Sequence, residues 1–259
     1  MAKRALKRHV QQELGTFAKK QDKHGTYRGA RKGEKRRHVG RPKKGARASE
    51  RHQTRKAFRS SEPVHVILRA HDQIVSLRKG EVFHAIREAL ITIGKLDDFH
   101  VVQFSVQRTH IHMVCEASDR QALWRGMQAF GISAAKHINA ALVDAEGKRR
   151  RGAVFPDRYH VRILKTPTQV RNCLRYVLNN WRHHGEDRGS QSRTWKLDPF
   201  SSAVTFEGWK EREERGGRFV QPLTYITPWV WTPSTWLLNV GWRKLGLISA
   251  FDVPGDGPE

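Results

Sequence analysis

The sequence predicts an α+β domain, a ferredoxin-like or RRM-like antiparallel sheet with helices packed on one face. We expect a basic N-terminal arm before it and a tryptophan-rich extension after it. Three observations lead to this prediction. Between residues 61 and 187, strand-like and helix-like periodicities follow one another in the order β-α-β-β-α-β-α. Residues 1–60 hold 21 Lys or Arg but only 4 Asp or Glu, and six of the eight tryptophans lie beyond residue 194.

The charge of the chain points to a polyanionic partner. Its 259 residues include 49 Lys and Arg and 25 Asp and Glu, a formal net charge of +24, and nucleic acid is the commonest partner of so basic a protein. Residues 1–60 have few large apolar side chains, so we expect them to form a disordered, DNA-binding arm. Its GRPKKGAR stretch contains the Gly-Arg-Pro core of a minor-groove-binding hook, which makes Arg41, Lys43 and Lys44 candidate DNA contacts. A solvated phosphate-binding tail is the alternative.

The remaining composition bears on location. Cys115 and Cys173, the two cysteines, lie in apolar contexts typical of buried thiols in a reducing compartment. No signal-like stretch and no run of 18 apolar residues occurs. We therefore expect a cytoplasmic, nucleoid-associated protein that neither spans nor binds a membrane.

The first half of the domain contains a strand, a helix and a hairpin. Residues 64–70, VHVILRA, form a short run rich in β-branched residues that predicts a strand. Residues 79–94 have apolar side chains at spacings of three and four, with Gly94 as a stop, which predicts a helix. Residues 99–107 and 110–117 alternate like strands and are separated by two residues, which is the spacing of a hairpin.

The second half adds two helices and a strand. A helix is predicted over residues 119–142, with Ser118 as N-cap and a bend near Gly131; its buried face is Leu123, Met127, Phe130, Ile132, Ala135 and Ile138. Residues 152–164 again alternate like a strand. Thr166, Pro167 and Gln169 then form a capping box that starts a third helix, ending near Gly185. Its apolar stripe is Val170, Cys173, Leu174, Val177, Leu178 and Trp181.

The C-terminal residues 188–259 have no comparable periodicity. We expect them to pack on the domain as an irregular extension anchored by tryptophans, with stacking of those rings on bases as the alternative.

Two histidines lie one residue apart in the predicted hairpin, in RTHIHMVCE. Because side chains alternate along a strand, His110, His112 and Val114 share one face, with the two imidazoles about 7 Å apart along it. Both can then reach one metal ion. A chain with 14 histidines contains a His-x-His triplet about once by chance, so hydrogen-bonded histidines of a half-buried strand are the alternative.

The third predicted helix offers partners for these histidines. Its step of about 100° per residue places Tyr176 and Asn180 together at the border of the apolar stripe, while Asn179 is directed away. An amide one turn after the tyrosine could supply an oxygen to the same metal. For Tyr176 alone, an amphipathic ring with its hydroxyl in water is the alternative.

With these motifs in this order, the chain resembles the HUH (His-hydrophobe-His) nucleases and, within them, the REP-associated tyrosine transposases. The resemblance extends from about Pro63 to Pro254 and includes PVHVILRA, HIHMV, FPDRYHVRILKTPTQVRNCLRYVLNNWRHHG, DPFSSAVTFEGW and TWLLNVGWRKLGLI. The GRPKK segment is similar to that of such transposases. The resemblance implies the HUH nuclease fold for residues 61–187.

It also implies a reaction and a site. Mg²⁺ or Mn²⁺ held by His110, His112 and, as third ligand, Asn180 polarises a phosphate of single-stranded or hairpin DNA, and Tyr176 attacks it to leave a 5′-phosphotyrosine link. Related enzymes often have glutamine in place of Asn180. No nucleotide cofactor is needed, since the covalent link conserves the energy of the broken bond. Arg158, near the site in sequence, is a candidate phosphate contact with surface solvation as the alternative, and a monomer is favoured over a dimer.

Three other functions are weighed against this one. A non-catalytic single-stranded nucleic-acid-binding protein could use an RRM-like sheet, but RNP-type aromatics are absent from the central strands. Replication initiators and relaxases of the same superfamily are usually larger. A three-carboxylate transposase is disfavoured because the strands lack suitably placed Asp and Glu.

Overall fold

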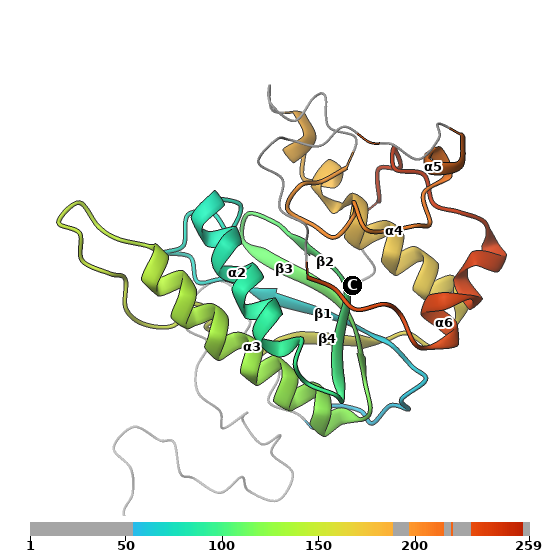
Figure 1. Cartoon of the computed structure of the whole chain (residues 1–259), viewed down its shortest axis with the longest axis horizontal. Coiled ribbons are helices and arrows are strands. Elements are labelled where there is room, and N and C mark those ends of the chain that lie inside the picture. Colours follow the sequence, from blue (N-terminus) through green and yellow to red (C-terminus); the bar gives the residue numbers. More distant parts are fainter. Residues whose placement is uncertain (1–53, 189–196, 215–218, 220–228, 256–259) are drawn as a thin grey trace, which may run out of the picture. The chain divides into compact units, whose positions relative to one another are not determined.

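Four antiparallel strands form one sheet in the centre of the fold (Figure 1). The computed structural model describes residues 54–188, 197–214, 219 and 229–255. In chain order the strands are β1 (Val64–Arg69), β2 (Phe99–Val106), β3 (His110–Ala117) and β4 (His160–Ile163), and they lie side by side as β2-β3-β1-β4. The predicted α+β class with an antiparallel sheet is confirmed. Residues 1–53 of the predicted arm, with Arg41, Lys43 and Lys44, lie outside the described residues, whereas residues 54–60 are described and Phe58 packs against the core, so the predicted arm is too long at this end.

Helices cover both faces of this sheet (Figure 1). Helices α2 (Gly80–Ile93) and α3 (Arg120–Ala141) pack on one face, and α4 (Pro167–His183) packs on the other. The expected order of elements is confirmed, but the expectation that the helices share one face is wrong. The reason is that β2 and β3 present apolar side chains, Val102 and Val114, to the second face, where they join the stripe of α4 in a second core.

A bulge in β2 makes this two-sided burial possible. The register against β3 shifts between Val101 and Gln103, so that one extra residue is inserted. Val101 and Phe104 consequently both point into the core under α2 and α3, while Val102 points to the α4 side.

Close packing of α3 on the sheet depends on one glycine. A Cβ atom at Gly126 would lie 2.2 Å from the ring of Phe99. Two local expectations for this helix are wrong. The N-cap is Asp119 and not Ser118, because the Asp119 carboxylate accepts from the N–H groups of Gln121 and Ala122. Ile132 is 65% exposed.

The predicted long strand over residues 152–164 is reduced to the four residues of β4. The segment before it is anchored without a ladder, because Val154 is buried and its carbonyl accepts from the N–H of His71 at 2.7 Å. Between α3 and this segment, residues 142–151 form a small hairpin.

The C-terminal residues contribute short helices to the core around α4. These are η1 (Glu186–Arg188), α5 (Lys210–Glu214), α6 (Trp236–Asn239) and η2 (Gly241–Leu245). Trp209 and Trp242 are buried there, as expected of anchors, whereas Trp229, Trp231 and Trp236 are 47%, 39% and 52% exposed. Trp195 lies outside the described residues.

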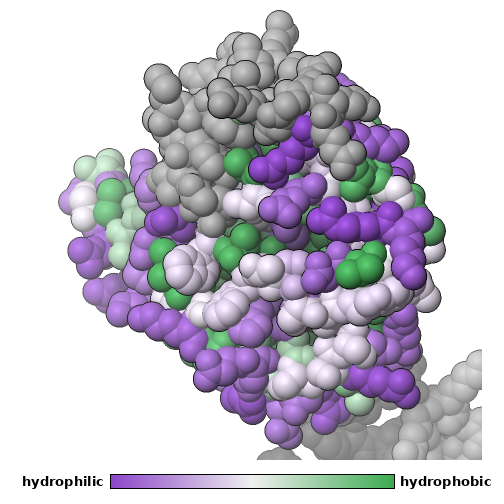
Figure 2. Space-filling model, turned by 45° about the vertical axis from the view of Figure 1, so that its right-hand side comes forward, coloured by the Kyte–Doolittle hydropathy of each residue, from purple (hydrophilic) through white to green (hydrophobic). Residues whose placement is uncertain are grey.

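Two further expectations concern burial and membranes. Cys115 and Cys173 are free and buried, and burial raises the pKa of both thiols, that of Cys173 to about 12. In the part of the chain that the structure describes, no helix has the length and apolar character needed to cross a bilayer. The face in Figure 2 is mostly hydrophilic or near neutral, with its hydrophobic residues in small separate groups.

Candidate metal and tyrosine site

The two histidines of β3 lie on the sheet face that α4 covers. His110 begins the strand and is partly exposed, whereas His112 is 1% exposed. Their ring centroids are 4.7 Å apart and the rings are nearly perpendicular. Both imidazoles can therefore be directed at one point above the sheet.

Helix α4 carries three side chains over this pair at intervals of one turn. Thr166 caps the helix by accepting from the N–H of Gln169, as predicted, and so fixes where the helix begins. The ring of Tyr176 lies 5.3 Å from that of His112, and the ring of His184, just past the helix end, lies 5.4 Å from that of His110. Asn180 is midway between Tyr176 and His184 on the same helix face, so it faces the two histidines.

Polar atoms without partners are concentrated at this place. Among the described residues, nine buried side-chain nitrogen or oxygen atoms have no hydrogen-bond partner, and four of them belong to three residues of this site. They are His112 Nε2, Asn180 Oδ1, Asn180 Nδ2 and Gln107 Oε1. Because a buried polar atom without a partner costs stability, such a group is explained by a ligand that is bound in function.

The donor set fits a divalent ion. Two imidazole nitrogens and an amide oxygen are ligand types that Mg²⁺ and Mn²⁺ accept alongside water and phosphate oxygens. The described residues contain no cluster of three or more His, Cys, Asp or Glu side chains that could hold a metal. The amide of Asn180, on the helix face that covers the histidines, offers an oxygen with no hydrogen-bond partner among the described residues.

His65 of β1 is a member of the site that the sequence did not identify. Its Nε2 lies 3.0 Å from Nδ1 of His112, and it is 8% exposed. Burial, with His160 and Arg162 nearby, lowers the pKa of His65 to about 3. A neutral His65 can accept a hydrogen bond from Nδ1–H of His112, which leaves Nε2 of His112 with its lone pair available.

The other histidines are also held neutral. Burial lowers the pKa of His110 to about 4, with contributions from His184 and Arg69. Burial and the neighbouring His65, His110 and His184 lower the pKa of His112 well below its ordinary value. Neutral imidazoles are the form that binds metal, so the site can bind metal without first losing protons.

Tyr176 lies at the border between the histidines and a pocket. It is partly exposed and, with His65, lines a pocket of about 420 Å³ between β1, the segment around β4 and α4. Arg162 and Arg175 also line this pocket. The tyrosine is therefore accessible to an anionic substrate that these guanidinium groups can attract.

A second unpredicted group lies at the end of β2. Gln107 and Ser105 lie on the α4 side of the sheet, and Ser105 is the register partner of His112. Gln107 Nε2 donates to Ser105 Oγ at 2.6 Å. Nearby, Arg78 donates to Asp198 through two nitrogens, at 3.0 and 2.9 Å, and to the carbonyl of Val106.

The structure thus brings together four of the candidate residues, His110, His112, Tyr176 and Asn180. Arg158 lies two residues before β4 and is partly exposed. Asn179 is directed away from the histidines, as expected, but it is buried and donates to the carbonyl of Ser249. His65 and Gln107 escaped prediction because neither lies in a motif, although alternation along β2 would place Gln107 beside His110.

The fold and this site define a class of protein, an antiparallel-sheet domain with a histidine pair and a helix-borne tyrosine. Residues 60–180 match the family described as "Transposase IS200 like". The matched part, a little under half of the chain, contains all four residues above and is similar to the IS200-like transposases. The family match agrees with the resemblance stated from the motifs over these residues.

Solved structures give two further likenesses. One is a REP-associated tyrosine transposase bound to a REP hairpin, 13% identical, with a TM-score of 0.44 over 71% of this chain and 100% of that one. The other is a protein described as a transposase from Deinococcus radiodurans, 13% identical, with a TM-score of 0.32 over 48% of this chain and 90% of that one. No curated protein sequence matches the chain.

Proposed function

We propose that this protein cleaves and rejoins single-stranded DNA at repetitive palindromic hairpins, through a covalent 5′-phosphotyrosine intermediate on Tyr176. The proposal rests chiefly on one observation, the unpartnered buried atoms of His112 and Asn180 directly beside the partly exposed Tyr176. The hairpin substrate follows from the resemblance of the motifs to REP-associated tyrosine transposases. The transposase role itself is part of this proposal, and it is supported by the match of residues 60–180 to the IS200-like family.

His110, His112 and Asn180 would hold Mg²⁺ or Mn²⁺, which supplies charge stabilisation at the scissile phosphate. His65 keeps His112 in the tautomer whose Nε2 is available. Arg162 and Arg175 hold the strand beside the site through its phosphates. In a proposed wider interface, Arg158 and the arm residues Arg41, Lys43 and Lys44 contact the DNA backbone.

The covalent step is a transesterification between Tyr176 and one phosphodiester of the DNA. The tyrosine oxygen forms a bond to phosphorus, the bond from phosphorus to the 3′ oxygen breaks, and that oxygen takes up the proton that the tyrosine loses. The product is a 5′-phosphotyrosine and a free 3′-hydroxyl. Rejoining is the reverse attack by a 3′-hydroxyl, so no nucleotide cofactor enters.

The structure argues against the RRM-like binding alternative. That mode needs one open sheet face on which bases stack. Here one face lies under α2 and α3 and the other under α4.

The test is adduct formation with labelled hairpin DNA and Mn²⁺, separated on a denaturing gel. Tyr176→Phe should form no adduct while it binds the hairpin like the wild type. Tyr159→Phe is the matched control, because the hydroxyl of this buried tyrosine has no partner among the described residues; it should form adduct normally. An adduct with Tyr176→Phe, or none with the wild type, would contradict the proposal.

A further inference from the structure

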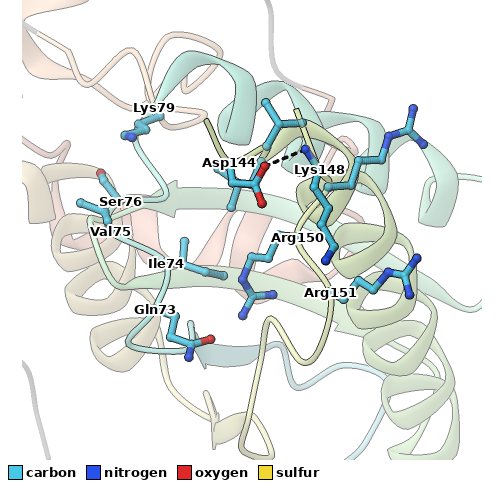
Figure 3. A pocket seen from close by; sticks show the side chains of 12 residues that line it. Gln73, Ile74, Val75, Ser76, Lys79, Asp144, Lys148, Arg150 and Arg151 are labelled. Carbon is cyan, nitrogen blue, oxygen red and sulfur yellow. Dashed lines mark hydrogen bonds between the residues drawn. The ribbon is translucent and has the colours of Figure 1, made fainter. Parts of the chain in front are cut away.

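A basic pocket lies between the loop before α2 and the hairpin that follows α3 (Figure 3). Its volume is about 520 Å³. One wall is the loop of residues 73–76 with Lys79, and the other is the hairpin of residues 142–144 and 148–151.

The charges in this pocket are almost all positive. Four exposed or partly exposed cations come from the hairpin run Lys148 to Arg151, and Lys79 comes from the opposite wall. The single acid in the lining, Asp144, accepts from the backbone N–H of Lys148 at 2.7 Å. No ion pair joins Lys79, Lys148, Arg149 or Arg151 to a carboxylate in the described part of the chain.

The hairpin that carries these cations has a fixed shape. Val143 and Arg149 form a β-bridge, and Gly147 makes the turn with a φ of 76°. The Arg150 guanidinium donates to Asn139 Oδ1 at 2.6 Å and to the carbonyl of Ala153 at 2.9 Å. Arg150 therefore braces the hairpin, and the side chains of Arg149 and Arg151 remain exposed. In Figure 1 the hairpin projects from the end of α3.

The pocket is connected to the histidine site through one loop. The N–H groups of Ala70 and Leu77 donate to the carbonyls of Thr109 and Arg108, in the turn between β2 and β3. His110 follows this turn directly. The loop that lines the pocket and the turn that leads into His110 are therefore held together by backbone hydrogen bonds.

We propose that this pocket binds the phosphate backbone of the base-paired stem of the hairpin whose single-stranded part enters the histidine site. This inference rests on the proposed function. Braced guanidinium groups without carboxylate partners suit phosphate oxygens, which carry no sequence information and serve to position a duplex. The stem and the cleavage site would then be held at a fixed separation by the loop between them.

The test compares two DNA ligands by fluorescence anisotropy in EDTA, so that no cleavage takes place. One ligand is a hairpin with a base-paired stem, and the other is an unpaired single strand of the same length. The double variant Arg149→Ser with Arg151→Ser is set against Lys95→Ser with Lys210→Ser, which removes the same charge from exposed positions outside this pocket. For the hairpin, losing two phosphate contacts should lower the slope of log affinity against log salt by about 2.

The same variant should bind the unpaired strand with a slope close to that of the wild type, and the control pair should change neither slope. The stem site would be overturned if the Arg149→Ser, Arg151→Ser variant lowered the salt slope equally for the hairpin and the unpaired strand, or if the control variant lowered it by the same amount. Because the readout is binding without metal, this outcome is independent of whether Tyr176 forms an adduct.

A second inference comes from a different observation, the unpartnered oxygen of Gln107. This side chain is 1% exposed, and its backbone N–H donates to the carbonyl of His110 at 2.8 Å. Gln107 and His110 are thus opposite one another across the hairpin, on the face that also carries His112. With Nε2 bonded to Ser105, only Oε1 of Gln107 lacks a partner in the described residues.

We infer that Gln107 Oε1 is a further protein ligand of the metal proposed for His110, His112 and Asn180, on which this inference rests. A neutral amide oxygen is a ligand that Mg²⁺ and Mn²⁺ favour. It would also give the buried oxygen the partner it lacks.

Gln107→Leu tests this, with Gln103→Leu as control, since Gln103 is on the same strand but its Oε1 already accepts from Ser202 Oγ. Calorimetric titration with Mn²⁺ should give at least about tenfold weaker binding for Gln107→Leu and unchanged binding for Gln103→Leu. Thermal melting in EDTA separates a loss of metal affinity from a loss of stability, because Gln107→Leu removes both the unpartnered oxygen and the hydrogen bond to Ser105 Oγ. Unchanged Mn²⁺ affinity would refute the inference, and absence of binding by the wild type would instead refute the metal site itself.

Discussion

The imidazole of His65 contacts Nδ1 of His112, whereas Nε2 of His112 has no hydrogen-bond partner among the described residues. His65 lies on the neighbouring strand β1, and its Nε2 is 3.0 Å from Nδ1 of His112. Because the pKa of His65 is lowered to about 3, it is neutral and can accept. The orientation of the His112 ring, the proposed metal ligand, is therefore set by a residue outside the His-x-His motif.

Replacing His65 by Phe should weaken Mn²⁺ binding by about 10- to 100-fold, because the second partner that orients a metal-binding histidine is lost. Isothermal titration measures the affinity. His160→Phe, an exposed histidine of the adjacent edge strand, serves as control and should bind Mn²⁺ normally. Equal affinity in the His65 variant would mean that the contact plays no part in metal binding.

Replacing Asn180 by Leu should show whether its amide oxygen binds a metal or only fills space in the core. Asn180→Leu removes two unpartnered buried atoms, so the metal-free protein should be as stable as the wild type or about 1 kcal/mol more stable. The same variant should lose the stabilisation that Mn²⁺ gives to the wild type. Urea unfolding with Mn²⁺ and with EDTA separates the two effects, and a variant that Mn²⁺ still stabilises fully would rule out Asn180 as a ligand.

At the scale of elements, replacing the two glycines of α3 by alanine should change the free energy of unfolding in opposite directions. Gly126 lies against the ring of Phe99, whereas a Cβ atom at Gly131 would meet nothing within 4 Å. Gly126→Ala should therefore lower the free energy of unfolding by about 1–3 kcal/mol. Gly131→Ala should raise it by about 0.5–1 kcal/mol, since alanine is the better helix former. Chemical denaturation measures both, and similar values would show that α3 does not pack closely on β2.

Features of the helices and strands that depend on nearby residues could be predicted from the sequence, whereas contacts between distant residues could not. Helix α4, with its Thr166 cap and its stripe, depends on neighbours within a few residues and was predicted correctly. His65 could not be assigned, since its contact with His112 joins residues 47 apart through the pairing of β1 with β3. The β2 bulge and the side of the sheet on which α4 packs are likewise tertiary. Ser118 and Asp119 are adjacent and both are residue types that cap helices, so the sequence alone could not show that Asp119 is the N-cap.

At the scale of the whole molecule, two cores share one sheet. The first lies under α2 and α3, and the second joins α4 to the C-terminal residues. Glu116, at the end of β3, reinforces the second core by accepting from the backbone N–H groups of Ser234 and Thr235. The histidines lie at the boundary of this second core, so their protonation acts on the stability of the fold.

The free energy of unfolding of the metal-free protein should fall as the pH decreases from about 6.5 toward 4. In this range the unfolded chain protonates its histidines, with an ordinary pKa of 6.5, while folded His65 and His110, at about 3 and 4, stay neutral. Each contributes at most about 1.4 kcal/mol per pH unit, and none above pH 6.5. Urea unfolding in EDTA across this range checks the sign, and His65→Phe should have a shallower slope than the wild type.

The spacing of four residues between Tyr176 and Asn180 has a consequence for how the site could be lost. Inserting one alanine between them would rotate everything after it by about 100° around the axis of α4. The tyrosine would stay beside His112, but the amide would turn away from the histidines. The proposed nucleophile and the proposed metal ligand are thus kept in phase by the pitch of a single helix, and a change of chain length there would separate them without altering either residue.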